Sequence, residues 1–322
     1  MARNKYSDHY SGIGGQAVIE GIMMKNKDKY AVAVRTPSGE INVALEEYES
    51  FAPSEKLTKI PFVRGIFNFI DSLILGTRTL NYSASFYEEE EEKLTRKQKQ
   101  KPLDRLFGEN AEKICTGFTV ALSVILAGAL FMLLPYFLSR FLSRWVASET
   151  LIAILEGVIR IAIFVLYLVS ISLMNDIKRV FMYHGAEHKC INCLEHGHAL
   201  TINNVKRSSR LHKRCGTSFL FLVVFISVVL FVFIRVNDPV MRVVVRILLI
   251  PVIAGISYEI IRLAGKSNSL FVRIISAPGL FLQKLTTREP DVEMIEVAMI
   301  AVDAVFDWRT YLYEEFGVII NE

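Results

Sequence analysis

The sequence predicts an all-α polytopic membrane protein with about four transmembrane helices, an interfacial or re-entrant helix and a small cytoplasmic N-terminal β element. Composition is the first observation behind this prediction. Apolar residues make up 52% of the 322 residues, charged residues 22%, and the mean hydropathy is +0.35, whereas soluble chains carry roughly 25% charged residues. The second observation is a set of four long apolar stretches. So much apolar surface excludes a largely disordered chain, and four Cys exclude a disulfide-stapled secreted scaffold.

Residues 1–55 are predicted to form the β-rich segment. Alternation over 30–36, a Pro-Ser-Gly turn signal after Thr36 and returning alternation over 40–45 indicate a hairpin. The preceding residues 12–21 are rich in Gly but lack the Lys-Ser/Thr pair of a phosphate-binding loop. We therefore expect a tight turn there, feeding a strand that packs closely against another backbone.

The segment 56–85 is predicted to be an amphipathic helix, with Pro61 at its first position and apolar residues at helical spacing. Arg64, Asp71 and Arg78 interrupt its apolar residues, which favours an interfacial or re-entrant helix over a spanning one. The next segment, 86–113, opens with a run of Glu followed by Lys and Arg. Such a block of opposite charges is typical of a solvated linker or a helix extension.

Four stretches are long and apolar enough to cross the roughly 30 Å hydrocarbon core of a bilayer. They fall into two pairs, in segments 114–175 and 217–262, separated by a polar segment 176–216 that we expect to be a loop. The segment 263–322 is predicted to be an amphipathic cytoplasmic region, with a helix over 291–306 opened by Pro290. The four stretches are 116–138, 150–174, 217–234 and 241–261.

The distribution of Lys and Arg predicts the orientation of the chain. These residues concentrate before the first stretch, between the second and third, and after the fourth. Short loops rich in Lys and Arg stay in the cytoplasm, so both termini and the 176–216 loop are expected to face the cytoplasm, in the plasma membrane. The formal charge of +4 is interpreted as this topology signal and not as a nucleic-acid surface. The expected partner is the lipid bilayer, and a membrane-protein partner or a homo-oligomer stays open.

Ionisable residues inside the apolar stretches are functional candidates, because an unpaired charge in the bilayer costs several kcal/mol. Glu156 and Arg160 are four residues apart and can pair on one helix face, which favours a structural ion pair. Glu259 lies at the cytoplasmic end of the fourth stretch, where a long side chain reaches water easily.

Five of the six His and three of the four Cys lie between residues 184 and 215. Within this cluster, 184–188 reads H-x-x-E-H, the pattern of inverted zincins. On a helix His184 and His188 project from the same face, where both can bind one metal ion. Glu187 beside them is then a candidate base that takes a proton from water activated by the metal. Candidates for the third ligand are His212, Cys215 and Glu259.

A second pattern competes for the same residues. Cys190-x-x-Cys193, then eighteen intervening residues, then His212-x-x-Cys215, fits the spacing of a closed structural zinc site. A reducing cytoplasm would keep these thiols free for a metal. The third interpretation is that no metal binds, so that the His residues hydrogen-bond to carboxylates and the Cys residues are small buried side chains.

Five strings spread over nearly the whole chain carry a family resemblance. Together they resemble the YqhQ-like family, bacterial multi-pass membrane proteins with a domain of unknown function and a description as predicted metal-dependent enzymes. The strings are GGQAVIEGIMMK (14–25), PFVRGIFNFIDSLILGTRTLNYSA (61–84), HGAEHK (184–189), SRLHKRCGTSF (209–219) and LTTREPD (285–291).

The resemblance implies no substrate, but it favours one set of site residues. It does not require Cys at both 190 and 193, and so turns the metal hypothesis away from the closed site. It also implies that Gln16, Glu20 and the pair Arg288-Glu289 lie on the cytoplasmic face near the 176–216 loop. The site residues that it implies are His184, His188, His212 and Cys215 as metal ligands, Zn as the metal, and Glu187 as the catalytic base.

Two functions from different classes follow from these observations. The first is a zinc-dependent hydrolase with a cytoplasm-facing metal site. The second is a non-enzymatic membrane scaffold or accessory factor for other membrane proteins, in which the His/Glu/Cys cluster is a polar latch between the loop and the β element. Transport is a weaker third interpretation, since four spans with few polar residues line a pore poorly. A wet cavity around Glu156 and Arg160 would favour it.

Overall fold

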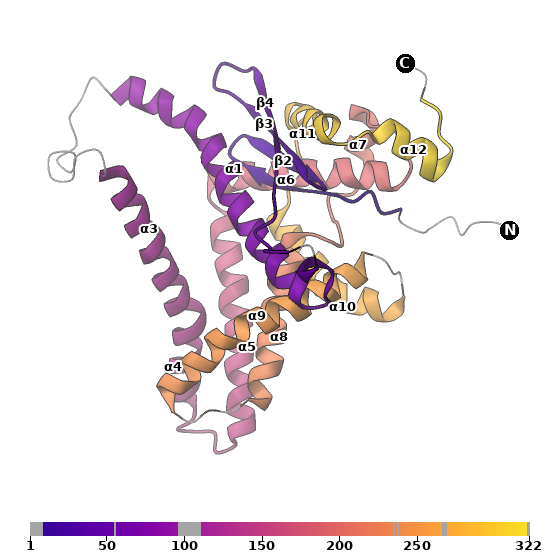
Figure 1. Cartoon of the computed structure of the whole chain (residues 1–322). Coiled ribbons are helices and arrows are strands. Elements are labelled where there is room, and N and C mark those ends of the chain that lie inside the picture. The colour runs from indigo at the N-terminus through magenta and orange to yellow at the C-terminus, as the bar shows by residue number, and fades with distance from the viewer. Residues whose placement is uncertain are drawn as a thin grey trace.

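The computed structural model describes residues 9–320 apart from 55, 96–110, 235, 237 and 266–268. Long helices form a bundle, and a small sheet with shorter helices covers one end of it (Figure 1). The sheet is antiparallel with its strands in sequence order, β1 (Ile13–Val18), β2 (Gly21–Asn26), β3 (Lys29–Arg35) and β4 (Ile41–Glu47).

The predicted hairpin is present as β3 and β4. Its turn closes with a hydrogen bond from the Gly39 N–H to the Thr36 carbonyl (2.9 Å), and Gly39 adopts a φ of +91° that favours glycine. The turn between β1 and β2 is also tight, with Glu20 at a φ of 47°. A Cβ at Gly21 would collide with the Ala33 carbonyl oxygen of β3. The expected close approach of two backbones in 12–21 is therefore correct.

Helix α1 (Val63–Thr95) is longer than the amphipathic helix predicted for 56–85. It begins two residues after Pro61, because Phe62 has a φ of 66° that no right-handed helix accepts. It continues through 86–95, so this part of the predicted linker is helical, and 111–113 begin the next helix, α3. The remainder of the linker, 96–110, lies outside the described residues.

Four helical segments are long and apolar enough to cross a membrane, as predicted. The first comprises α3 (Ala111–Gly128), the π-helical turn η3 (Ala129–Leu133) and α4 (Leu134–Leu142). The large apolar side chains of α3 between Phe118 and Leu126 are exposed in the isolated chain, which is consistent with contact with lipid. The other three are α5 (Glu149–Ser172), α8 (Gly216–Phe233) and α9 (Pro239–Ala264).

The expectation of a loop over 176–216 is wrong for most of that segment. Residues 175–195 form α6 (Asn175–Glu195), and α7 (Ile202–Arg207) follows. Helix α6 packs against β1, β2 and α11 (Val292–Val305), and its second half is buried almost completely. Sequence polarity is misleading here because the charged and polar residues of α6 are buried with hydrogen-bonding partners, as described below.

The C-terminal segment contains α10 (Leu270–Thr286), α11 and α12 (Trp308–Phe316). In the N-terminal half, the short 3₁₀ helix η1 (Leu57–Lys59) precedes α1. Helix α11 confirms the helix predicted for 291–306. Asp291 caps it by accepting a hydrogen bond from the Met294 N–H (2.8 Å), directly after Pro290. Its apolar face is fully buried against the sheet and α6, with Met294, Ile295, Ala298 and Val302 in the core.

Candidate metal centre

The H-x-x-E-H string lies on α6, and its two His rings meet edge to face on one face of the helix, with an interplanar angle of 61°. The ring centroids of His184 and His188 are 4.4 Å apart, as expected for side chains at positions i and i+4. Cys215, the N-cap residue of α8, closes the group from the other side. One ligand atom of each of the three residues lies within 4.8 Å of the others, and the His184 Nε2 is 3.2 Å from the Cys215 Sγ.

Backbone carbonyls orient both rings. The Nδ1 of His184 lies 2.8 Å from the Thr286 carbonyl oxygen, and the Nδ1 of His188 lies 2.7 Å from the Arg210 carbonyl oxygen. A carbonyl oxygen only accepts, so each Nδ1 carries the proton. The Nε2 atoms are then the ring atoms that could bind a metal ion, that of His184 after loss of the proton it shares with Cys215. Such an arrangement is usual in metal sites, where an outer partner sets the tautomer of each His ligand.

The Cys215 thiol and the neighbouring imidazole rings shift each other's pKa. Burial alone would raise the pKa of Cys215, but the rings of His184 and His188 lower it well below its usual value. Burial alone would lower the pKa of His184, but the Cys215 thiolate and its hydrogen bond raise it to about 9. The two rings thus favour the thiolate of Cys215, the form that binds metals.

The donor set fits a zinc ion. Zinc favours thiolate and imidazole ligands, with Zn–S near 2.3 Å and Zn–N near 2.0–2.1 Å, so sulfur and nitrogen in a tetrahedral site lie about 3.5 Å apart. The 3.2 Å between His184 Nε2 and Cys215 Sγ is close to that spacing. Three protein ligands would leave one coordination position open, as in catalytic zinc sites.

Glu187 lies beside the three ligand candidates and is 5% exposed. Burial raises the pKa of Glu187, against the lowering effect of the His188 and His184 rings and of the Gly15 N–H. Strand β1 covers this carboxylate at Gly15, where a Cβ would lie 2.7 Å from the Met23 carbonyl oxygen and 3.0 Å from the Glu187 Cγ. Only glycine permits this approach.

His212, the fourth predicted ligand, lies next to the group but outside it. Its ring centroid is 5.6 Å from that of His188, and its Nε2 lies 3.3 Å from Glu195, which also pairs with Arg214. Burial alone would raise the pKa of Glu195, but hydrogen bonds and charges from His212, Arg214 and the Ser11 N–H lower it to about 2. Burial lowers the pKa of His212. The His212 side chain thus serves a hydrogen-bond network on the N-terminal side of α8.

The other candidate ligands are held elsewhere. Glu259 accepts hydrogen bonds from the Arg64 Nε (2.7 Å) and the Phe62 N–H (3.1 Å), away from the group. Cys190 lies in the apolar core, and the Cys193 thiol donates to the Ala199 carbonyl (3.4 Å). Within the described residues, the closed four-ligand site does not form.

Strings far apart in the sequence meet at this site. A Cβ at Gly185 would collide with the Arg288 carbonyl oxygen, so the glycine of HGAEHK lets the LTTREPD segment lie directly on α6. The Arg288 N–H also donates to the Phe181 carbonyl (2.8 Å). The Lys189 Nζ lies 3.0 Å from Glu289.

The residues implied by the resemblance also reach α6 or its neighbours. Glu20 pairs with Arg179 and accepts a hydrogen bond from the Tyr183 hydroxyl (3.3 Å). Gln16 contacts α1 at Gly76, where its amide occupies the space of the missing side chain. Glu20 thus joins β1–β2 to α6, and Gln16 joins β1 to α1.

Sequence reasoning missed Glu195, Asn192 and the backbone carbonyls that orient the rings. The Asn192 amide donates to the Ser209 (2.7 Å) and Leu211 (3.0 Å) carbonyls, which holds the 209–211 segment against α6. Extending the helical spacing from 188 to 192 and 195 would have placed both residues on the ligand face.

These features define a helical protein with four candidate membrane-spanning helices and a buried His₂Cys group beneath a small sheet. The chain belongs to the protein family of unknown function DUF1385, which matches residues 60–308 and so includes the three ligand candidates and Glu187. It is 34% identical over 311 residues to the uncharacterized protein YqhQ of Bacillus subtilis (strain 168), covering 93% of this chain and 92% of that protein. The resemblance to the YqhQ-like family is thereby confirmed. No solved structure matches the chain.

Proposed function

We propose that this protein is a zinc-dependent hydrolase of the plasma membrane, with the sheet, α6 and both termini on the cytoplasmic side. The observation that carries the proposal is the convergence of His184, His188 and Cys215 within 4.8 Å beside a buried carboxylate. The orientation follows from the excess of Lys and Arg in the segments that flank the spans on this side.

Three side chains would hold the ion. His184 and His188 offer their Nε2 atoms, because their Nδ1–H groups donate hydrogen bonds to the backbone carbonyls of Thr286 and Arg210. Cys215 offers a thiolate. Zinc supplies Lewis acidity and lowers the pKa of water toward neutrality when it is bound. Its binding has to displace the proton shared by His184 and Cys215, which makes metal affinity fall with falling pH.

Glu187 is the candidate base. Its carboxylate lies next to the ligands on the same helix, and the buried surroundings exclude bulk water, which strengthens its interactions with nearby charges. A carboxylate in this place accepts a proton from attacking water and passes it to the leaving group, the role of a general acid–base. The substrate class stays open.

One experiment separates metal binding from chemistry. Elemental analysis of the purified full-length protein is expected to give about one zinc per chain. The variant Glu187→Gln is expected to keep that zinc and its fold, since an amide oxygen still accepts from the Gly15 N–H, but to fail to complement a deletion strain. Absence of stoichiometric zinc refutes the metal site. Full complementation by Glu187→Gln refutes the hydrolase.

A specific observation supports the scaffold hypothesis as the second candidate. The N-terminal segment is tied to α6 by polar contacts, from the Ser11 N–H (3.0 Å) and hydroxyl (2.8 Å) to Glu195 and from Glu20 to Arg179. Such contacts would hold the N-terminal segment on α6 without any catalytic activity. Co-purification of a stoichiometric membrane protein, retained in Glu187→Gln and lost in Glu195→Ala, would favour it over the hydrolase.

A further inference from the structure

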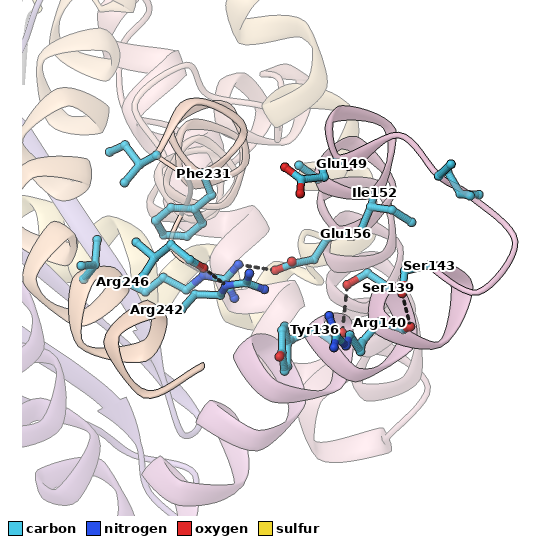
Figure 2. A pocket seen from close by; sticks show the side chains of 16 residues that line it. Tyr136, Ser139, Arg140, Ser143, Glu149, Ile152, Glu156, Phe231, Arg242 and Arg246 are labelled. Atoms are coloured by element: carbon cyan, nitrogen blue, oxygen red, sulfur yellow. Dashed lines mark hydrogen bonds and ion pairs between the residues drawn. The ribbon is translucent and has the colours of Figure 1, made fainter. Parts of the chain in front are cut away.

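The far end of the helical bundle, away from α6, contains a cavity of about 450 Å³. It lies between α4, α5, α8 and α9, and charged side chains from three of these helices converge on it (Figure 2). The five charged residues that line it are Arg140, Glu149, Glu156, Arg242 and Arg246. Glu156 lines this cavity, whereas Arg160 does not.

Three of the charged residues at this place are buried deeply. Glu156, Arg160 and Arg246 are 7%, 6% and 8% exposed. Glu156 accepts a hydrogen bond from Arg160 (2.9 Å), which confirms the predicted ion pair, and a second from Arg246. Two guanidinium groups therefore share one carboxylate, and the triad carries one positive charge more than it can neutralise.

The surroundings compensate for this charge only in part. The Phe231 ring lies against both cations, with the Arg160 Cζ at 5.2 Å and the Arg246 Cζ at 4.9 Å from its centroid. The stabilisation from cation–π contacts of this kind is smaller than the cost of an uncompensated buried ion. The buried Arg160 Nε has no hydrogen-bond partner among the described residues.

The mouth of the cavity adds further positive charge. Arg140 and Arg242 line it with Arg246, against Glu149 and Glu156, so three cations face two carboxylates and the lining carries +1. Arg160, behind Glu156, raises the local sum to +2. The buried triad itself leaves one positive charge in excess inside the bundle, and an anion in the cavity would balance it.

We propose that this cavity binds a phosphate group, carried by a lipid headgroup or free in solution. Guanidinium groups pair with phosphate oxygens through parallel, charge-assisted hydrogen bonds. The local charge of +2 matches a phosphate of one to two negative charges. The site is separate from the metal centre, since Glu156 lies about 24 Å of helix from the end of α5 at Ser172.

The test uses the full-length protein in phosphate-free detergent solution. Isothermal titration is performed with inorganic phosphate, dioctanoyl phosphatidylglycerol and dioctanoyl phosphatidylcholine, the last as a lipid of no net charge. The variants are Arg246→Gln, Arg140→Gln and Glu156→Gln. Arg144→Gln is the matched control, because Arg144 lies in the same helix-end region and packs on Phe141, outside the cavity lining.

The variants are expected to shift affinity in both directions. Arg246→Gln should weaken binding about 30-fold, and Arg140→Gln, which lies at the exposed mouth and leaves the triad intact, about fivefold. Glu156→Gln should tighten binding about tenfold, since it removes a repelling charge. A purely structural triad would instead lose stability in Glu156→Gln with no gain in affinity. Arg144→Gln should change affinity less than twofold.

The probes distinguish the sources of the phosphate. Binding of phosphatidylglycerol but not of inorganic phosphate identifies a lipid headgroup, and competition between the two identifies a site that accepts free phosphate. Either result supports the proposal. Binding of neither probe overturns it, as does binding that Arg140→Gln and Glu156→Gln leave unchanged.

Discussion

At one end of the helical bundle, between α6, α8 and β1, the rings of the two candidate His ligands have fixed protein partners. The rings of His184 and His188 donate to carbonyl oxygens, and the Cys215 thiolate faces both rings. At the other end, between α4, α5, α8 and α9, two buried arginines share the single carboxylate of Glu156.

The difference lies in what completes each cluster. The charges of the His₂Cys cluster balance each other, and its ligand atoms lie within 4.8 Å of one another, so the cluster could hold a metal cation. The Arg/Glu cluster has positive charge in excess, so it calls for an anion. Buried polar groups without a partner cost free energy. The charge of each cluster therefore indicates the kind of ligand that it could bind.

The largest expected effect is on the metal centre. Cys215→Ala removes the only thiolate among the ligand candidates, so zinc affinity should fall by about three orders of magnitude, more than the 10–100-fold that loss of an outer partner costs. Competition with a fluorescent zinc chelator measures it. The matched control is Cys193→Ser, whose hydroxyl can still donate to the Ala199 carbonyl and which should keep its zinc. Equal loss in both variants would contradict the assignment of Cys215.

The next effect concerns the packing that supports this centre. Gly185→Ala places a methyl group against the Arg288 backbone carbonyl, so it should destabilise the fold by about 3 kcal/mol and lower zinc occupancy with it. Thermal unfolding followed by circular dichroism measures the loss. Gly128→Ala, where a Cβ meets nothing within 4 Å, is the control and should be neutral or stabilising. A wild-type melting temperature for Gly185→Ala would show that the segment around Arg288 does not pack as described.

A smaller effect, dependent on pH, is expected at Glu195. Because its folded pKa of about 2 lies below its ordinary value of 4.5, its contribution to stability is complete above pH 4.5 and is lost as pH falls toward 2. Glu195→Gln should therefore cost about 2 kcal/mol at pH 7, and the difference from wild type should shrink below pH 4.5. Melting temperatures across this range test it. Glu296→Gln, at an exposed ion pair with Arg35, should cost little at any pH.

The smallest effect is expected in the Arg/Glu cluster, in the absence of a ligand. Arg160→Gln leaves the Glu156–Arg246 pair intact and removes the excess charge, so the stability of the ligand-free protein should change by less than about 1 kcal/mol. Unfolding in phosphate-free detergent measures it. A loss of several kcal/mol would mean that the triad is balanced as it stands, and the contrast between the two clusters would then disappear.

Much of the fold could be predicted from the sequence because its signals are local. The four apolar stretches, the hairpin around Gly39 and the helix capped by Asp291 each follow from hydropathy, turn residues or helical spacing within a short window. The 176–216 segment could not be predicted in this way. Its helix α6 is polar by composition and is buried because partners from β1, α10 and the 209–211 segment satisfy its side chains.

In the candidate site, too, some features follow from local sequence patterns and others depend on tertiary packing. The placement of His184 and His188 on one face depends only on the 3.6-residue period of a helix, and Glu187 follows with them. The sequence by itself therefore determined that two imidazoles and a carboxylate share one stretch of helix, and that the chain is apolar enough to cross a membrane four times.

Only the tertiary structure decided which residue completes the group and where charge is left in excess. Cys215 lies near the two rings because α8 begins beside α6. The side chain of His212, three residues earlier, points toward Glu195 instead. Arg246 joins Glu156 across ninety positions of sequence. Ligand atoms must meet within a few ångströms, and such distances between remote segments depend on how helices pack, a property that local sequence patterns do not carry.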